Sequence, residues 1–340
     1  MAISQGITIF ATCPQSKDLP PDRYLENVRD VARWSEAAGC KGILVYTDNG
    51  LVDPWLVSQE VVRATEKLAP LVAVQPIYMH PYSVAKMVSS LAFMHGRRLF
   101  LNMLAGGFKG DLIALGDKTE HDDRYKRTVE YSRIVLDLLR GESPVSCSGH
   151  WYQVENLTLA PPLPAQLFPG VLISGSSDAG LEAAKAIGAV PVRYPKPPEE
   201  QEAMAEAHGI RVGIVARADA NEAWRVALER FPEDRRGQVT HKLATKASDS
   251  HWHHQLSGRD GGAELDDSGE PNPYWLGPFQ NYKTFCPYLV GSHERVAEEV
   301  AEYMRLGSTH FILDIPASEE ELAHIGTVFE RAESLAATRP

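Results

Sequence analysis

The strongest constraint on the fold is an alternation of two kinds of apolar segment along the chain. Short runs rich in β-branched residues alternate with longer segments in which apolar residues recur every three or four positions. This alternation is typical of repeated βα units. The strand-like runs lie near residues 3, 42, 71, 99, 171, 190, 210 and 310. Eight such units predict an α/β fold, a (β/α)8 TIM barrel with insertions, whose active site lies at the carboxyl ends of the strands.

The rhythm spans both ends of the chain, so we expect residues 1–340 to form a single barrel domain. It is interrupted at 149–169, a proline-rich segment that predicts an excursion off the barrel. Residues 199–208 are predicted to be a helix. Periodicity is lost from 235 to 285, where Gly, Asp, Ser and His are frequent. An irregular segment of that length predicts a lid-like insertion after strand 7.

Charge and cysteine content exclude several classes of protein. The net charge of −11, without a basic cluster, argues against nucleic acid and membrane surfaces as partners. No apolar run approaches the length of a membrane span. The four cysteines are widely separated and form no CxxC pair. This spacing argues against a disulfide framework and favours a cytoplasmic protein.

The most informative local motif is Ser174-Gly175-Ser176-Ser177-Asp178, between a predicted strand and a predicted helix. Glycine allows close backbone approach, and the amino end of a helix offers N–H groups to an anion. The motif therefore predicts a phosphate cradle. The alternative is an ordinary helix N-cap at Ser177.

Several short motifs occur in a characteristic order through almost the whole chain. They are Asp53-Pro54-Trp55-Leu56-Val57, Arg97 to Asn102 running into Ala105-Gly106-Gly107, His121 to Tyr125, Gly149-His150-Trp151-Tyr152, Gly175 to Ala179, and Leu289-Val290-Gly291-Ser292. In this order they resemble the bacterial luciferase-like flavin-dependent monooxygenases, and are most similar to the alkanesulfonate monooxygenase branch.

The resemblance implies reduced FMN as the cosubstrate, lying across the barrel mouth. By position, Ser176 and Ser177 match the group that holds the flavin phosphate. His121 and Tyr125 match the pair that flanks the cofactor, and the loop 105–107, with Ala105 and Gly106, matches the one against the isoalloxazine. For His121 and its neighbours the alternative is an acidic helix N-terminus that favours the macrodipole.

Departures from the branch concern the substrate. Arg211 matches a strand 7 arginine, but the histidine expected two residues later is Gly213. Leu51 stands in place of a cysteine after strand 2, and Ile315 in place of a tyrosine. An arginine-bearing loop is replaced by residues 281–288. Because a sulfonate needs cationic clamps, these changes argue against a simple alkanesulfonate substrate.

The candidate catalytic residues are Arg211, Cys13 and His80. Cys13 ends strand 1 and either contacts substrate or is a buried inert thiol. His80 is either a base or a packed residue at a strand end. His251-Trp252-His253-His254 lacks a carboxylate at ligand spacing, so we expect a lid segment and no metal site.

We therefore expect a two-component monooxygenase that uses reduced FMN (FMNH2) and O2. It would insert one oxygen atom into a small organic substrate, with specialised metabolism as one setting. A flavin reductase would supply FMNH2, and the resemblance implies a homodimer formed through the helices after strands 2 and 3. An F420-dependent oxidoreductase of the same superfamily and a non-catalytic flavin-binding protein are the alternatives. The protein would supply orientation and a dry cavity.

Overall fold

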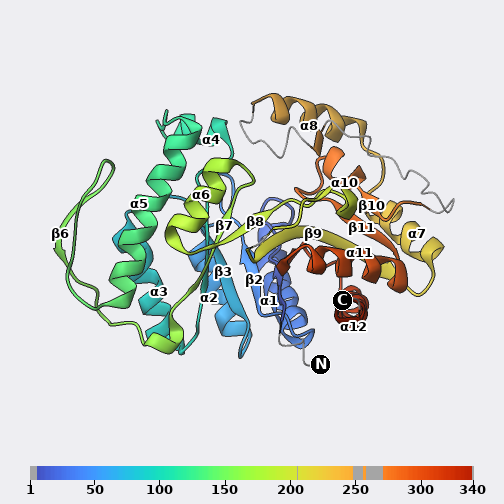
Figure 1. Ribbon diagram of the computed structural model, residues 1–340, viewed down its shortest axis with the longest axis horizontal. Helices are drawn as coiled ribbons and strands as arrows, with labels where there is room; N and C mark the ends of the chain where they lie inside the picture. The colour runs from blue at the N-terminus through green and yellow to red at the C-terminus, as the bar shows by residue number, and fades with distance from the viewer. Residues whose placement is uncertain (1–5, 205, 248–255, 258–270, 339–340) are drawn as a thin grey trace. The chain divides into compact units, whose positions relative to one another are not determined.

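The computed structural model describes residues 6–204, 206–247, 256–257 and 271–338. The fold class is the predicted α/β (β/α)8 TIM barrel, and its eight parallel strands are the eight runs expected from the sequence (Figure 1). These strands are β1 (Thr8–Thr12), β2 (Gly42–Val45), β3 (Ala69–Val74), β4 (Phe100–Met103), β7 (Gly170–Ser174), β8 (Val190–Arg193), β9 (His208–Arg217) and β12 (Ser308–Leu313).

Helices follow most of these strands. They are α1 (Pro21–Ala37), α2 (Pro54–Ala64), α3 (Pro81–His95), α4 (Lys109–Ala114), α5 (His121–Arg140), α6 (Asp178–Ile187), α7 (Ala220–Arg230), α8 (Arg235–Ala247), α10 (Gly277–Gln280), α11 (His293–Arg305) and α12 (Glu319–Thr338), with 3-10 turns η1 (Ala165–Leu167) and η2 (Pro198–Glu200). Gly96 and Gly141, both in the left-handed conformation, end α3 and α5.

The chain divides into two compact units. Unit 1 comprises Met1–Thr12, Trp34–Cys40 and Val192–Pro340, and unit 2 comprises Cys13–Arg33 and Lys41–Pro191. The expectation that residues 1–340 form one domain stays a prediction.

Unit 2 contains the parallel strands β2, β3, β4 and β7, paired in that order. The strands β2 to β4 are buried along their whole length, as continuous apolar strands in parallel sheets usually are. Side chains of β3 and β4 pack with α3 and α5 in one apolar cluster. The predicted excursion is a hairpin of β5 (Val145–Ser148) and β6 (Gln153–Leu157), which stands outside α5 in Figure 1.

Unit 1 is organised around the long strand β9. Its first half pairs in parallel with β12, and its second half, from Gly213, pairs in parallel with β11 (Tyr288–Ser292). A two-residue strand, β10 (Tyr274–Trp275), pairs antiparallel with β11. The sequence did not predict β10 or β11. Helices α11 and α12 pack over β9 and β12 in a second apolar cluster.

Two predicted segments were wrong. The helix expected over 199–208 is only the 3-10 turn η2, and β9 already begins at His208. Pro197 and Pro198 favour a turn, and pairing of β9 with β8 and β12 outweighs the helical pattern. The segment 235–285 is not structureless, because α8, β10 and α10 lie within it. Its role as a lid stays a prediction.

No helix in the described part of the chain is long and apolar enough to cross a membrane.

Candidate functional site

The predicted phosphate cradle lies in unit 2, where β7 ends and α6 begins. Ser177 is the N-cap of α6, and its Oγ accepts a hydrogen bond from the N–H of Gly180 at 3.2 Å. The alternative expected for Ser177, a helix cap, is therefore present in the structure. An N-cap leaves the first N–H groups of the helix able to bind an anion.

Gly175 is required at the cradle because Tyr125 lies against it. A Cβ at this position would stand 2.2 Å from the Tyr125 hydroxyl oxygen and 3.1 Å from its Cζ. Gly180 is also close, since a Cβ there would meet the Gly175 carbonyl oxygen at 3.2 Å. The structure thus brings together the two predicted elements, the glycine-serine turn and Tyr125 of α5.

Ser176 supplies the second sign of an anion site. Its Oγ is buried and has no hydrogen-bond partner among the residues that the structure describes. Leaving a buried hydroxyl unsatisfied is costly, of order 1–3 kcal/mol. A phosphate oxygen at the start of α6 would provide the missing acceptor. The chemistry of the cradle therefore fits the phosphate of FMN.

Helix α5 presents the other predicted flanking residue. The rings of His121 and Tyr125 meet edge to face with centroids 5.2 Å apart, and His121 Nδ1 lies 2.7 Å from Asp122 Oδ1. Behind them, Arg127 donates to Asp117 in a buried ion pair of 2.6 Å. This pair fixes the segment that enters α5.

The loop after β4 also has the expected close-packed backbone. Gly106 has a φ of 100°, and a Cβ there would lie 3.0 Å from Leu112 Cδ2 and 3.2 Å from Gln75 Oε1. Ala105 is buried. A positive φ and the tight contacts together require glycine at 106. Such a loop can offer backbone rather than side chains to a flat ligand.

Cys13 is a buried thiol, and His80 caps a helix. Cys13 is buried, and burial raises the pKa of its thiol, so the group is neutral at physiological pH. His80 is the N-cap of α3, with Nδ1 accepting from the N–H of Tyr82 at 3.2 Å. Its ring also meets Tyr152 edge to face. These contacts favour the inert alternative for both, and their catalytic roles stay predictions.

Arg211 lies in unit 1, on β9. Its Nη2 lies 3.6 Å from Oδ1 of Asp314, the residue that follows β12. Asp314 in turn accepts hydrogen bonds from Thr284 and Tyr288. Sequence reasoning missed Asp314, Thr284 and Tyr288. The available signal was an acidic residue directly after the apolar run Phe311-Ile312-Leu313, at the carboxyl end of a strand.

Tyr288 explains one departure from the alkanesulfonate pattern. A Cβ on Gly213 would lie 2.3 Å from carbon atoms of the Tyr288 ring. The ring therefore fills the space that a histidine at 213 would need. Burial, and then the nearby Asp314, raise the pKa of Tyr288 well above its usual value. The phenol is neutral and donates to the carboxylate.

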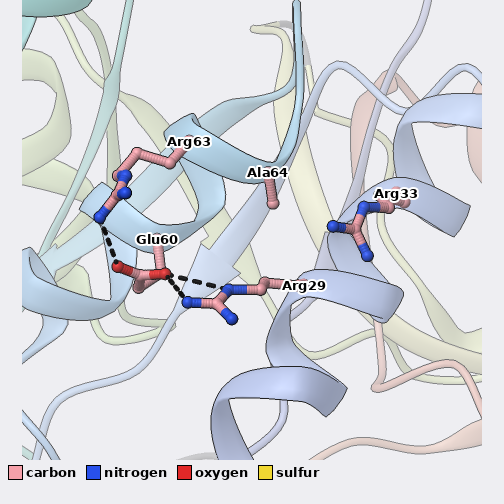
Figure 2. Close-up of a pocket in the computed structure, with 5 residues that line it drawn as sticks. All are labelled: Arg29, Arg33, Glu60, Arg63 and Ala64. Carbon is pink, nitrogen blue, oxygen red and sulfur yellow. Dashed lines mark hydrogen bonds and ion pairs between the residues drawn. The ribbon is translucent and has the colours of Figure 1, made fainter.

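A separate surface hollow of about 320 Å³ lies between α1 and α2 (Figure 2). Arg29 and Arg63 both contact Glu60, at 2.6 and 3.4 Å. Arg33 and Ala64 complete the lining. The hollow is at the carboxyl end of α2, away from the strand ends where barrel enzymes bind substrate. Its exposed ion pairs are the kind that contributes little, so we assign it no function.

No group of three or more metal-ligating side chains occurs within the described ranges. The segment 251–254, with its three histidines, lies outside them.

Known proteins resemble this chain in sequence and in fold. Residues 6–310 match the family model of the luciferase-like monooxygenases. The chain is 35% identical over 318 residues to the 4-(gamma-L-glutamylamino)butanoyl-[BtrI acyl-carrier protein] monooxygenase BtrO of Niallia circulans, covering 90% of this chain and 91% of that protein.

Two solved structures have the same fold at low sequence identity. EDTA monooxygenase EmoA from Chelativorans sp. BNC1 has a TM-score of 0.70 at 14% identity, over 99% of this chain and 95% of that one. An F420-dependent secondary alcohol dehydrogenase has a TM-score of 0.60 at 14% identity, over 96% and 98%. The family match and the relative at 35% identity agree, and the chain belongs to the luciferase-like monooxygenase family.

Proposed function

We propose that this protein is the oxygenase of a two-component system, which takes FMNH2 from a flavin reductase and inserts one atom of O2 into a small organic substrate. The observation that carries the proposal is the cradle, with the buried hydroxyl of Ser176 and the close approach of Tyr125 to Gly175. When bound, reduced FMN supplies the electrons that activate oxygen.

The chain's own residues have three tasks in this proposal. Ser176 and the N-terminal N–H groups of α6 bind the phosphate, whose negative charge the helix dipole favours. His121 and Tyr125 flank the cofactor. The backbone of residues 105–107 lies against the ring system, where the tight turn at Gly106 leaves little room for side chains.

Anaerobic titration tests the cofactor. We expect reduced FMN to bind more tightly than reduced riboflavin, because only FMN has the phosphate that the cradle would hold. The contact is worth about 1.5–3 kcal/mol, or roughly 10-fold to 150-fold in affinity. Equal affinities would refute the cradle. The F420-dependent neighbour in fold supports one alternative, and tighter binding of reduced F420 than of FMN would select it.

The substrate is better tested with carrier-bound acyl chains than with alkanesulfonates. BtrO, by its name, acts on an acyl group held by an acyl-carrier protein. In this chain Gly213 gives its space to Tyr288, so one of the polar groups expected around a sulfonate is absent from β9. Oxygen uptake and product mass, measured with FMNH2 and both substrate types, decide this. Uptake that no substrate changes would favour the non-catalytic alternative.

A homodimer through α2 and α3 is part of the proposal. Large apolar side chains are exposed on these helices: Leu56, Met87, Phe93 and Met94. Phe93 is 74% exposed, which is unusual for a phenylalanine without a partner surface. Light scattering at micromolar concentration should give twice the monomer mass of 37.5 kDa. A monomer would remove this part of the proposal.

We also propose a cytoplasmic location. The four cysteines, Cys13, Cys40, Cys147 and Cys286, are all unpaired, as expected in a reducing compartment.

A further inference from the structure

The inner face of α8 packs closely against the segment that contains α10 (Figure 1). Gln238 donates a hydrogen bond of 3.1 Å to Asn281, and a Cβ on Gly237 would lie 2.1 Å from the carbonyl oxygen of Asn281. The ring of His241 meets that of Phe279 edge to face, with centroids 4.6 Å apart. These contacts fix the position of α8 and the direction of its outer face.

The same segment links α8 to the carboxyl end of a barrel strand. Lys283 forms an ion pair of 2.7 Å with Asp234, the residue before α8. The next residue, Thr284, donates a hydrogen bond to Asp314, which directly follows β12. In a (β/α)8 barrel the carboxyl ends of the strands carry the active site. Helix α8 is therefore held on the side of unit 1 at which a substrate would arrive.

The outer face of α8 has an apolar centre with basic side chains on both sides. Val239 and Leu243 are 60% and 64% exposed, and they are neighbours because residues four positions apart share one side of a helix. Arg235 and Lys242 extend along one flank of this centre, and Arg236 lies along the other. All three basic side chains are exposed. The solvent face of a surface helix is usually polar, so the apolar centre indicates a surface that contacts a partner.

This outer face also differs in charge from the rest of the chain. The chain has a net charge of −11, whereas α8 contains no aspartate or glutamate. Within the described ranges, its exposed basic side chains form no ion pair. An acidic partner would be repelled by the chain as a whole and attracted to this face, which would therefore set the orientation of docking. An apolar centre with a charged rim is the usual composition of a protein–protein interface.

We propose that the outer face of α8 docks the acyl-carrier protein that brings the substrate, and that it contacts an acidic surface of that protein. Arg235, Arg236 and Lys242 pair with carboxylates of the carrier, and Val239 and Leu243 pack against apolar side chains between them. This inference rests on the proposed function, under which carrier-bound acyl chains are the candidate substrates, and it adds the place at which the carrier binds. A membrane surface is a less suitable occupant, because two apolar side chains offer little area for insertion into lipid.

The test is a calorimetric titration of BtrI, the acyl-carrier protein in the name of BtrO, into the full chain without flavin. We expect binding that weakens at least about 10-fold between about 50 and about 500 mM NaCl, because salt screens the charged rim. Arg235→Glu combined with Lys242→Glu reverses the charge of one flank and should weaken binding at least about 30-fold. Val239→Ala combined with Leu243→Ala removes the apolar centre and should weaken it about 10-fold.

Lys41→Glu combined with Lys185→Glu is the matched control. Both lysines are exposed residues of unit 2, and the two substitutions change the net charge by the same amount as Arg235→Glu with Lys242→Glu. The control should keep the affinity for BtrI within about 3-fold of the wild type. All the substitutions are on the surface, so each variant should unfold thermally within about 3 °C of the wild type.

Three outcomes overturn the proposal. They are no binding of BtrI by the wild type at about 100 μM, equal weakening by the α8 variants and the control, and binding through α8 to phosphatidylglycerol vesicles without binding to BtrI. Because no flavin is present, these results are independent of the FMN titration. The docking face and the proposed cofactor can therefore fail separately.

Discussion

The two units each contain a buried pair of one arginine and one aspartate, and the two pairs differ in geometry. In unit 2, Arg127 and Asp117 are 2.6 Å apart, and the second carboxylate oxygen accepts from the N–H and hydroxyl of Thr119. In unit 1, Arg211 and Asp314 are 3.6 Å apart and come from different strands. The first pair is closed and the second is open.

This difference separates a pair held within one segment of the chain from a pair held between strands. In the closed pair both carboxylate oxygens have hydrogen-bond partners within the segment that enters α5. Such a pair holds the helix that presents His121 and Tyr125, and it has little capacity for a ligand. In the open pair, Arg211 lies in the first half of β9 and Asp314 follows β12. Asp314 is oriented by residues from another segment, Thr284 and Tyr288. Disturbing the two pairs should therefore give different phenotypes.

The largest effect on stability is expected at Gly213, which leaves space for the Tyr288 ring that donates to Asp314. Gly213→Ala would place a methyl group 2.3 Å from the Tyr288 ring, so the ring and its hydrogen bond to Asp314 must move. Overpacking of this kind costs about 1–3 kcal/mol, and we expect the free energy of unfolding in urea to fall by about 3 kcal/mol.

The matched control is Gly291→Ala, on the neighbouring strand β11, where the nearest atom to a new Cβ is Val296 Cγ2 at 3.5 Å. This variant should stay within about 1 kcal/mol of the wild type. If Gly213→Ala is as stable as Gly291→Ala, the Tyr288 ring does not depend on the space at Gly213.

A smaller effect is expected at the cradle that the closed pair supports. Ser176→Ala should weaken binding of reduced FMN by about 2 kcal/mol, roughly 30-fold, and leave binding of reduced riboflavin unchanged. Ser177→Ala is the paired variant. Its hydroxyl caps α6, so it should lower unfolding free energy by about 1 kcal/mol and affect the two flavins more equally. The reverse pattern would place the phosphate contact on Ser177.

The glycine-serine turn at the start of α6 was predictable from sequence, and the pair of Arg211 and Asp314 was not. Gly175, Ser176 and Ser177 are contiguous in the sequence. A motif of glycine and serine before a helix can therefore be recognised without knowledge of the fold. Asp314, by contrast, gains its partners only when residue 211 and the segment 284–288 meet it in space. The strand β11, which brings Tyr288 there, followed a segment without periodicity and was missed. The apolar runs of the eight barrel strands were found because burial on both faces leaves a strong pattern.

Predictions of helices were wrong where strand pairing or solvent exposure decided the structure. Residues 199–208 have a helical pattern, but β9 takes His208 into a ladder with β12. Helix α8 was missed because its apolar residues Val239 and Leu243 are exposed and give only a weak stripe. Apolar periodicity reflects burial, so it does not reveal a helix that buries little of its surface.

The smallest expected effect concerns the closed pair and its pH dependence. Burial alone would raise the pKa of Asp117, but hydrogen bonds from Arg127 and Thr119 outweigh it and lower the pKa to about 2. An unfolded aspartate titrates near pH 3.9. The contribution of the charged carboxylate to stability is therefore fully present above about pH 4 and is lost as the pH falls toward 2.

Asp117→Asn tests this role because it keeps the shape of the side chain and removes its charge. A charge-assisted hydrogen bond is about twice as strong as a neutral one, so we expect a loss of about 1 kcal/mol in unfolding free energy at pH 7. The difference in unfolding free energy between the wild type and the variant should shrink between pH 4 and pH 3, since the charged carboxylate of the wild type then contributes less to stability. A variant as stable as the wild type at pH 7 would show that the closed pair is not a structural support and would remove the distinction between the two pairs.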